Sequence, residues 1–486
     1  KGCKVVRKGM STKLIFRELY KKNIVGILSD QDAGRGGTFV NFFGRPTSAH
    51  IGPFEIAKHT DSIILPNFIV RTNGPFHKLY LEEYIEMKGI NTEEGIKNSL
   101  QKYMSLLEKY IRKYPDQWLW LHKRWKSTPK RTILVLSDGK AGHLNQSLAV
   151  AHQIRRARMT QGYKMEDTAV VTLNVEYKNR FSRLLLLLMA PFASWRCHGR
   201  MHLMRFCLKE DSYENLMKTY AEFIVSCGSS LAPVNIFMKH ENNARNIVIM
   251  KPGMPFCTKK FNFMIVPRHD NMRICKNVVV TDLAPNLVSE EALRLSGEKL
   301  KNSIKPGKDR RIGLLIGGDT PEFSLSGGIL EKVLQQVTAF CDSNDMDMLV
   351  TTSRRTNKEQ EKIIKNTLKD NPRCKLLVIA NENNPEGTVA GILALSDLAV
   401  VSGESISMIS EAVSAGRKVV VFNLDGKAGA ITKHERVVDN LKREGYLGIA
   451  DAQDLGTALA TFSKSVLSAK KIDDTEKIYE AMRALI

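Results

Sequence analysis

The sequence predicts an α/β protein in which a short α/β domain precedes two doubly wound, Rossmann-like domains. From residue 132 onward, apolar strands alternate with helical segments, and this βαβα pattern occurs twice, over about 170 residues each time. A basic, proline-containing linker, HKRWKSTPKR at 122–131, separates this part from the first segment. The sequence therefore predicts domains at residues 1–128, 129–305 and 306–486.

The expected elements follow from hydrophobic periodicity. In the first domain we expect strands at 23–30, 62–70 and 76–87 and an amphipathic helix over 94–114. The second domain begins with the strand TILVLS at Thr132, and the third with RIGLLIGGD at Arg311. A final helix over 474–485 is compatible with packing against either Rossmann-like domain.

The chain is strongly basic, with 73 Lys and Arg against 51 Asp and Glu and a net charge of +22. Such an excess favours an anionic partner. No nucleic-acid-binding motif is present, so we expect a phosphorylated lipid or an anionic membrane surface and no nucleic acid. The eight cysteines are scattered without a CxxC pair, which indicates neither a zinc site nor a disulfide framework.

The most apolar run of the chain is LLLLLMAPFA at 184–193, half the length needed to span a bilayer. Arg180 and Arg183 precede it and Trp195 follows it. This arrangement is typical of an interfacial segment, and equally of a buried helix end with solvated arginines. On the interfacial interpretation, replacing Leu185 and Leu187 by Asp should weaken binding to anionic vesicles.

Polar residues and glycines follow the first expected strand, in SDQDAGRGGTFVNFFGRP at 29–46. Glycines in such a loop let backbone N–H groups approach an anion such as a phosphate. This segment, with HIGPFEIAKHTDSIILPNFIVR at 50–71 and DQWLWLHKRWKS at 116–127, resembles the lauroyl/myristoyl acyltransferases of lipid A synthesis. The resemblance covers residues 1–128 and implies part of a glycerolipid acyltransferase-like domain.

That resemblance implies acyl transfer from acyl carrier protein to a phosphorylated lipid A precursor, by a peripheral protein at the cytoplasmic face of the bacterial inner membrane. The family's catalytic His-x4-Asp/Glu motif precedes the matched region, so we expect it upstream of Lys1, and the catalytic dyad is not assigned within this chain. Trp120, His122 and Arg124 suit either core and surface positions or an aromatic, cationic belt at a lipid surface. The residues expected to bind the acceptor and its phosphates are Asp30, Gln31, Asp32, Gly34 and Arg71.

Two turns in the later domains can hold an anion at a helix N-terminus. The first, DGKAG at 138–142, is neither a GxGxxG motif nor a P-loop, so neither a dinucleotide nor another cofactor is expected, and no metal. In the second, Ser405 and Ser407 open a helix whose N-terminus can hold a diphosphate, with Glu411 accepting hydrogen bonds from a ribose. An ordinary Ser-capped helix would look the same.

Together with CGSS at 227–230, GGDTPEFSLS at 317–326 and TTSRRT at 351–356, these turns resemble the family named for the mitochondrial fission factor ELM-one, over residues 131–460. They are also similar to two-domain GT-B glycosyltransferases. This implies a nucleotide-sugar donor, with His143, or His269 with Asp270, as an acceptor-side base or as structural residues. The residues implied to face the donor are Gly317, Gly318, Asp319, Thr352, Ser353, Arg354, Ser405, Ser407 and Glu411.

The resulting hypothesis is an enzyme of glycolipid assembly, in which an acyltransferase part is fused to a glycosyltransferase-like unit. The alternative from another class is a non-catalytic second module that acts as a membrane-associated binding or remodelling adaptor. Binding of nucleotide sugars separates the two hypotheses.

Overall fold

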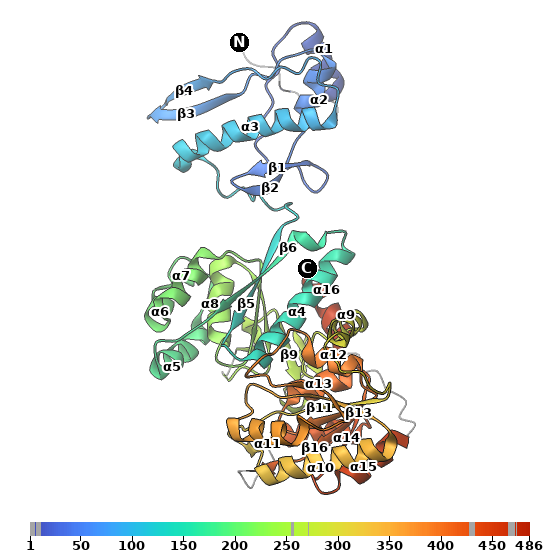
Figure 1. Ribbon diagram of the computed structural model, residues 1–486. Coiled ribbons are helices and arrows are strands. Elements are labelled where there is room, and N and C mark those ends of the chain that lie inside the picture. The colour runs from blue at the N-terminus through green and yellow to red at the C-terminus, as the bar shows by residue number, and fades with distance from the viewer. Residues whose placement is uncertain are drawn as a thin grey trace. The chain divides into compact units, whose positions relative to one another are not determined.

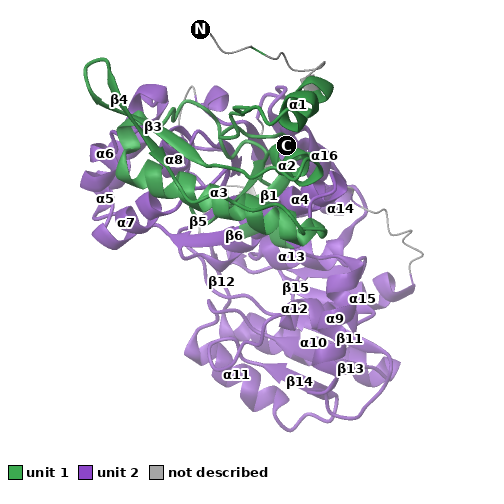
Figure 2. Ribbon diagram, turned by 90° about the horizontal axis from the view of Figure 1, so that it is seen from above, with its two compact units in different colours: residues 1–131, 166–169 green, residues 132–165, 170–486 purple. Residues whose placement is uncertain are grey.

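The computed structural model describes residue 5 and residues 11–253, 257–270, 272–426, 433–464, 472 and 474–486 (Figure 1). The chain divides into two compact units, coloured separately in Figure 2. Unit 1 comprises residues 1–131 and 166–169, and unit 2 comprises residues 132–165 and 170–486.

Unit 1 contains two antiparallel hairpins, a long helix and shorter helices. The long helix buries Ile96, Leu100 and Met104 against Phe42 and Phe54, because apolar residues three and four apart share one face. The elements are α1 (Ser11–Tyr20), β1 (Thr38–Phe42), β2 (Arg45–Ala49), α2 (Gly52–His59), β3 (Asn67–Asn73), β4 (Phe76–Leu81), α3 (Glu93–Lys113) and η1 (Pro115–Gln117).

The helix predicted over 94–114 is confirmed as α3, whereas the strand predicted over 23–30 is wrong. Residues 23–30 form no ladder, and the side chains of Ile24 and Leu28 are 100% and 91% exposed. An apolar run becomes a strand only beside another backbone, and the described part of the chain places none next to this one. The strand predicted over 62–70 is reduced to β3 and one bridge between Ile64 and Ile85.

The first lobe of unit 2 contains a six-stranded sheet in the order β10-β9-β8-β7-β5-β6. Its strands are apolar along most of their length because helices cover both faces. The strands are β5 (Arg131–Ser137), β6 (Thr168–Asn174), β7 (Phe223–Cys227), β8 (Arg245–Ile249), β9 (Phe263–Pro267) and β10 (Val278–Thr281). The helices are α4 (Ala141–Thr160), η2 (Met165–Asp167), α5 (Arg180–Met189), η3 (Ala190–Phe192), η4 (Trp195–Cys197), α6 (His202–Cys207), α7 (Glu210–Lys218), α8 (Ala232–Asn242), η5 (Thr258–Lys260) and η6 (Arg268–Asp270).

The second lobe contains a parallel sheet in the order β14-β13-β11-β15-β16-β18. Its strands are β11 (Arg311–Leu315), β13 (Asp347–Thr351), β14 (Cys374–Val378), β15 (Leu398–Ser402), β16 (Lys418–Phe422) and β18 (Leu447–Ala450), with β12 (Phe323–Ser324) and β17 (Asp425–Gly426) pairing outside the sheet. The helices are α9 (Glu290–Lys301), α10 (Gly327–Asn344), α11 (Lys358–Leu368), α12 (Thr388–Ala394), α13 (Ile406–Ser414), α14 (Lys433–Arg443) and α15 (Leu455–Lys464). The last helix of the chain is α16 (Asp474–Leu485).

These two sheets confirm the predicted fold class, an α/β chain with two doubly wound lobes. In the second lobe the chain starts at β11, builds outward through β13 and β14, and then returns to the other side of β11 with β15. The reversal makes the neighbouring ends of β11 and β15 a switch point, where open α/β sheets bind ligands.

Two helices connect the lobes, and the domain boundary at residue 305, which falls between α9 and β11, stays a prediction. Helix α9 packs on α12, and Leu300 joins the core of the second lobe. Helix α16 packs on α4, and Met482 joins the core of the first lobe. Asp474 fixes the crossing, since its Oδ2 accepts hydrogen bonds from the backbone N–H groups of Asp282 and Leu283, both at 2.8 Å.

Candidate functional site

The carboxyl edge of the first-lobe sheet carries a histidine held by an aspartate. Strand β5 ends at Ser137, Asp138 follows it, and His143 lies in the first turn of α4. The imidazole Nδ1 is 3.0 Å from Asp138 Oδ2. With Nδ1–H donating to the carboxylate, Nε2 is the proton acceptor of the ring. This is the arrangement of a general base with its orienting carboxylate.

Asp138 is kept ionised by its neighbours. Burial by itself would raise the pKa of Asp138, but the hydrogen bond from His143 and the charge of Lys140 outweigh it and lower this pKa. Lys140 Nζ lies 3.6 Å from Oδ2, and the Ser230 hydroxyl donates to the same oxygen at 3.3 Å. Asp138 is therefore a carboxylate, able to stabilise an imidazolium on His143.

The CGSS segment at 227–230 lies against this pair. Gly228 has a φ of +87°, and a Cβ on it would stand 2.9 Å from His143 Cε1, so the ring occupies the space that a side chain would need. Ser230 is held through its carbonyl, which accepts from the Tyr177 hydroxyl at 2.6 Å. Burial raises the pKa of the Cys227 thiol, so Cys227 is not suited to be a nucleophile.

The carboxyl edge of the second-lobe sheet brings three of the predicted loops together, after strands β13, β11 and β15. The backbone N–H of Gly317 donates to Ser402 Oγ at 2.7 Å, and that of Gly318 donates to Glu404 Oε1 at 3.0 Å. The Thr356 hydroxyl donates to the carbonyl oxygen of Gly317 at 2.5 Å. The switch point is thus built from glycine, serine and threonine contacts.

Gly317 and Gly318 are required by the packing of the protein itself. A Cβ on Gly317 would lie 1.5 Å from Glu404 Oε1, and one on Gly318 would lie 2.2 Å from the carbonyl oxygen of Arg355. Any side chain here would displace the neighbouring loop. The sequence predicted that these glycines face a nucleotide-sugar donor. In the structure they allow the loop after β11 to pack closely against Glu404 and Arg355.

Glu404 is a residue of this edge that the sequence analysis missed. Its side chain is buried (1% exposed), and burial raises its pKa. Arg355 Nη2 lies 3.5 Å from Oε1, whereas the described part of the chain gives Oε2 no hydrogen-bond partner. A signal was available, because Glu404 lies two residues after the end of the apolar strand β15, but nothing in the local pattern marks a carboxyl group as buried.

The N-terminus of α13 is not capped by a serine side chain, so the alternative interpretation of this turn as an ordinary Ser-capped helix is wrong. Ser405 occupies the cap position, but its side chain makes no capping hydrogen bond. Ser407 does not cap either, since its hydroxyl donates to Glu411 Oε1 at 3.3 Å. Burial raises the pKa of Glu411 to about 7. Neither serine hydroxyl therefore accepts a hydrogen bond from the backbone N–H groups of the first turn of α13, which leaves these donors available to a ligand.

The other residues predicted to face a donor mostly hold the loops in place. Asp319 Oδ1 accepts from the Leu325 N–H at 2.9 Å, and Thr352 Oγ1 accepts from the Ala380 N–H at 2.9 Å. Ser353 Oγ accepts from the Arg355 N–H at 3.0 Å. Arg354 is exposed in the same loop.

The second predicted base, His269 with Asp270, is only partly described. The side chain of His269 lies outside the described residues. Asp270 is buried, and its Oδ2 accepts from the backbone N–H of Lys251 at 3.2 Å. This contact ties two loops of the first lobe together.

In unit 1 the segment at 29–37 meets the segment at 116–127. The buried Asp32 accepts from the Ser127 hydroxyl at 2.7 Å and from the Gly34 N–H at 2.9 Å, and its own N–H donates to His122 Nε2 at 3.1 Å. Within the described residues, Asp32 Oδ2 has no hydrogen-bond partner. Two motifs 90 residues apart in the chain thus form one cluster.

The remaining predicted residues of unit 1 are spread around this cluster. Arg124 is a core residue, with Nη1 donating to the Ser48 carbonyl at 2.6 Å. Asp30 is half-buried and Gln31 is exposed. Arg71 lies on β3, where its backbone N–H donates to Gln117 Oε1 at 2.8 Å.

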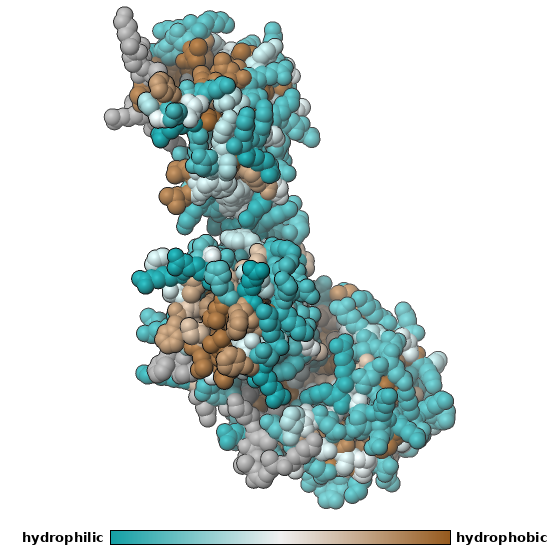
Figure 3. All heavy atoms as spheres, turned by 90° about the vertical axis from the view of Figure 1, so that its left-hand side faces the viewer, coloured by the Kyte–Doolittle hydropathy of each residue, from teal (hydrophilic) through white to brown (hydrophobic). Residues whose placement is uncertain are grey.

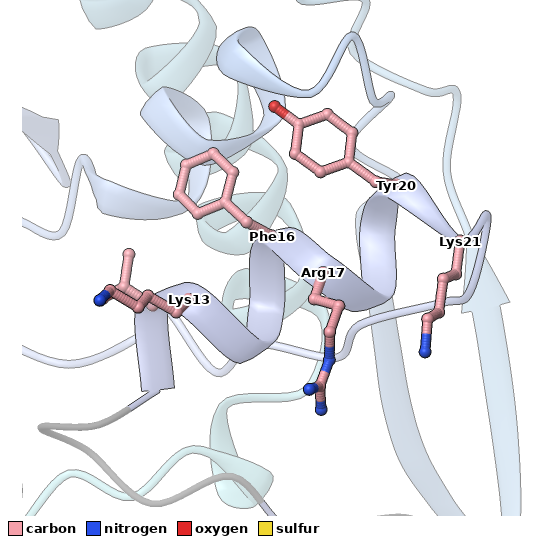
Figure 4. A pocket seen from close by; sticks show the side chains of 6 residues that line it. Lys13, Phe16, Arg17, Tyr20 and Lys21 are labelled. Carbon is pink, nitrogen blue, oxygen red and sulfur yellow. The ribbon is translucent and has the colours of Figure 1, made fainter.

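A depression along α1 is lined by Lys13, Phe16, Arg17, Tyr20 and Lys21 (Figure 4). It is formed by side chains of α1 and of Lys21 just after it, and Figure 4 shows Phe16 and Tyr20 on one side of the helix and Arg17 and Lys21 on the other. None of the predicted site residues lines it.

The fold and the two sheet edges define a two-lobed α/β protein with polar groups at the carboxyl ends of both sheets. The chain belongs to the mitochondrial fission ELM1 family, whose model matches residues 141–486. The family model of the bacterial lipid A biosynthesis acyltransferases matches residues 1–127. Both resemblances predicted from the sequence are confirmed.

Individual relatives match the two parts separately. An uncharacterised protein of Rickettsia prowazekii is 22% identical over 325 residues, which are 60% of this chain and 82% of that protein. The lipid A biosynthesis palmitoleoyltransferase of Escherichia coli is 32% identical over 119 residues, which are 24% of this chain. The chain spans 37% of the length of that acyltransferase.

Solved structures with a similar chain path include two UDP-GlcNAc 2-epimerases. The enzyme from Methanocaldococcus jannaschii is 10% identical, with a TM-score of 0.44, over 73% of this chain and 99% of its own. The enzyme from Neisseria meningitidis, bound to UDP-GlcNAc, is 11% identical, with a TM-score of 0.43, over 73% of this chain and 98% of its own.

Proposed function

We propose that residues 132–486 form a glycosyltransferase that uses a nucleoside diphosphate sugar. The observation that carries the proposal is the Asp138–His143 pair, in which a carboxylate orients a general base. The pair lies at the carboxyl edge of the first-lobe sheet, and open α/β sheets bind ligands at this edge. His143 Nε2 takes the proton of an acceptor hydroxyl while that oxygen bonds to the anomeric carbon of the sugar. The bond from that carbon to the diphosphate oxygen breaks, and the nucleoside diphosphate leaves with its electron pair. Asp138 stabilises the imidazolium that results.

The second-lobe edge supports the donor half of the proposal. The first-turn N–H groups of α13 and the exposed Arg354 offer positive potential and hydrogen bonds to a diphosphate. Burial raises the pKa values of Glu404 and Glu411, which reduces the negative charge that would repel this anion.

Isothermal titration calorimetry with UDP-sugars tests the donor half on the full chain. We expect binding, and about tenfold weaker affinity in Arg354→Ala because one charged contact to the diphosphate is lost. Lys369→Ala removes an exposed charge of the same lobe and should bind like the wild type. Folded protein that gives no heat with any nucleotide sugar contradicts the proposal and favours the non-catalytic adaptor.

For unit 1 we propose the acceptor-binding part of a lipid A-type acyltransferase, which takes acyl groups from acyl carrier protein. The family match at residues 1–127 and the buried Asp32, with one oxygen unpartnered, support it. The exposed Gln31 beside it offers a test, because Gln31→Ala should weaken binding of a phosphorylated lipid A precursor without changing thermal stability. Surface plasmon resonance measures this binding, and equal affinity of the wild type and of Gln31→Ala for the lipid A precursor would contradict the proposal.

A further inference from the structure

A row of exposed apolar side chains lies on the first lobe. In α5, Phe181, Leu184 and Leu188 are exposed at spacings of three and four residues, so they share one face of the helix. Phe192 and Trp195, in η3 and η4, continue the row and are 77% and 74% exposed. We call these five side chains, together with Phe206 of α6, the α5 platform.

The α5 platform rests on a rigid base. On the other side of α5, Leu186 and Ala190 are buried in the core of the first lobe, and Leu185 and Leu187 pack against it. Helices α5 and α6 contact each other, and α5, η3 and η4 all contact α8. Figure 3 shows the apolar side chains gathered on this part of the first lobe. Helix α5 is therefore apolar on two sides, of which one has no partner within the described residues.

The chain segment that carries the α5 platform is basic, although Glu241 of α8 accepts a hydrogen bond from its Gly199 N–H and Glu176 pairs with Lys209. Residues 178–209 contain seven Lys and Arg and no Asp or Glu. The arginines are exposed, and the Arg196 guanidinium lies 5.7 Å from the centroid of the Trp195 ring. An apolar face with arginines and a tryptophan around it fits a surface that is apolar at depth and anionic at the level of its phosphates.

We propose that the α5 platform docks on the surface of an anionic lipid bilayer. Phe181, Leu184 and Leu188 enter the boundary between acyl chains and headgroups, and the arginines bind the lipid phosphates. Among the described residues no helix is both long enough and apolar enough to cross a membrane. The inference does not depend on the transferase proposal, and its test needs no nucleotide sugar.

The structure also identifies the residues with which to test it. Leu185 and Leu187, which the sequence offered for substitution by Asp, face the core and would report on folding. Leu184 and Leu188 are the exposed pair. The matched control is Met159→Asp with Met165→Asp, since both methionines are exposed in the same unit but lie outside the platform.

The experiment is flotation of the full chain with phosphatidylcholine vesicles, with and without phosphatidylglycerol. We expect binding to the anionic vesicles, weakening steeply with added salt. Leu184→Asp with Leu188→Asp should lower this binding about tenfold or more, because two apolar contacts are replaced by charges that repel the surface. The methionine control should bind like the wild type.

A second readout locates the contact. Brominated lipids should quench part of the tryptophan fluorescence in the wild type, and Trp195→Phe should remove that part of the quenching. Vesicle binding that survives the double leucine substitution, equal binding to neutral vesicles, or quenching unchanged by Trp195→Phe would overturn the proposal. The last result, with binding retained, would place the lipid contact on the three tryptophans of unit 1, Trp118, Trp120 and Trp125.

Discussion

The two sheet edges of unit 2 treat buried and partly buried carboxyl groups in opposite ways. Burial acts on Asp138 in the first lobe as it does on Glu404 and Glu411 in the second. At Asp138 a histidine and a lysine supply compensating hydrogen bonds and charge, and its pKa falls. At Glu411 the main compensation is one serine hydroxyl, and its pKa rises to about 7.

The difference teaches that the partners of a carboxyl group, more than its depth, decide which chemistry an edge can perform. The first edge keeps a carboxylate that can stabilise a cation on His143. The second edge disfavours negative charge on Glu404 and Glu411, beside the N-terminus of α13. The positive end of the helix dipole is therefore available to an anion. The proposed function assigns proton transfer to the first edge and diphosphate binding to the second.

Of the predicted substitutions, removal of the His143 imidazole should have the largest effect on the rate of the proposed reaction. We expect His143→Asn to lower the rate of UDP release, measured with a phosphorylated lipid A precursor as acceptor, by about 10²–10⁴-fold, while calorimetric affinity for the nucleotide sugar is unchanged. Asp138→Asn should lower the rate similarly by disturbing the imidazole. His152→Asn, on the same helix, is the control. A rate loss equal in both histidine variants would mean that His143 has no special role.

Replacing Glu411 tests the second edge through stability. The folded-state pKa of about 7 lies above the ordinary glutamate pKa of 4.5, so Glu411 favours folding in its neutral form, and this contribution is lost as the pH rises through 7. Relative to the wild type, we expect Glu411→Gln to gain about 1–3 kcal/mol above pH 8 and nothing below pH 4.5. Urea unfolding across this pH range measures it, and a gain independent of pH would refute a neutral Glu411.

Displacing the imidazole without removing it should have the smallest effect on folding. Gly228→Ala strains a residue with φ of +87° and pushes on His143, so we expect a loss of about 1 kcal/mol in stability and about tenfold in rate. Gly162→Ala has the same φ with nothing near its Cβ. It should lose similar stability and no rate, and a rate loss there would show that strain alone explains both variants.

Much of the architecture could be predicted because it depends on repeated local patterns. Apolar strands such as those beginning at Thr132 and Arg311 reappear as β5 and β11, and glycine- and serine-containing turns follow them. His143 could be nominated because its turn follows a strand. Its pairing with Asp138 required coordinates, since five residues separate the two across the start of a helix.

Other features depend on information that a local pattern does not hold. The five consecutive leucines at 184–188 show no alternation of apolar and polar residues, so the sequence does not indicate which side of the helix faces the core. The sequence alone could therefore not tell the exposed Leu184 from the buried Leu186. The run at 23–30 has the composition of a strand but forms no ladder. Glu404 was missed because burial of a charged residue is a property of the assembled lobe.

The return of α16 to the first lobe has a consequence for synthesis of the chain. Ile478, Tyr479 and Met482 are part of the core that β5 and α4 begin more than 300 residues earlier. As the chain leaves the ribosome, the first lobe must wait for almost the whole second lobe before this part of its core can close. Until then the apolar face of α4 that α16 later covers is exposed to water. A chaperone or another transient binding partner would bind to this face.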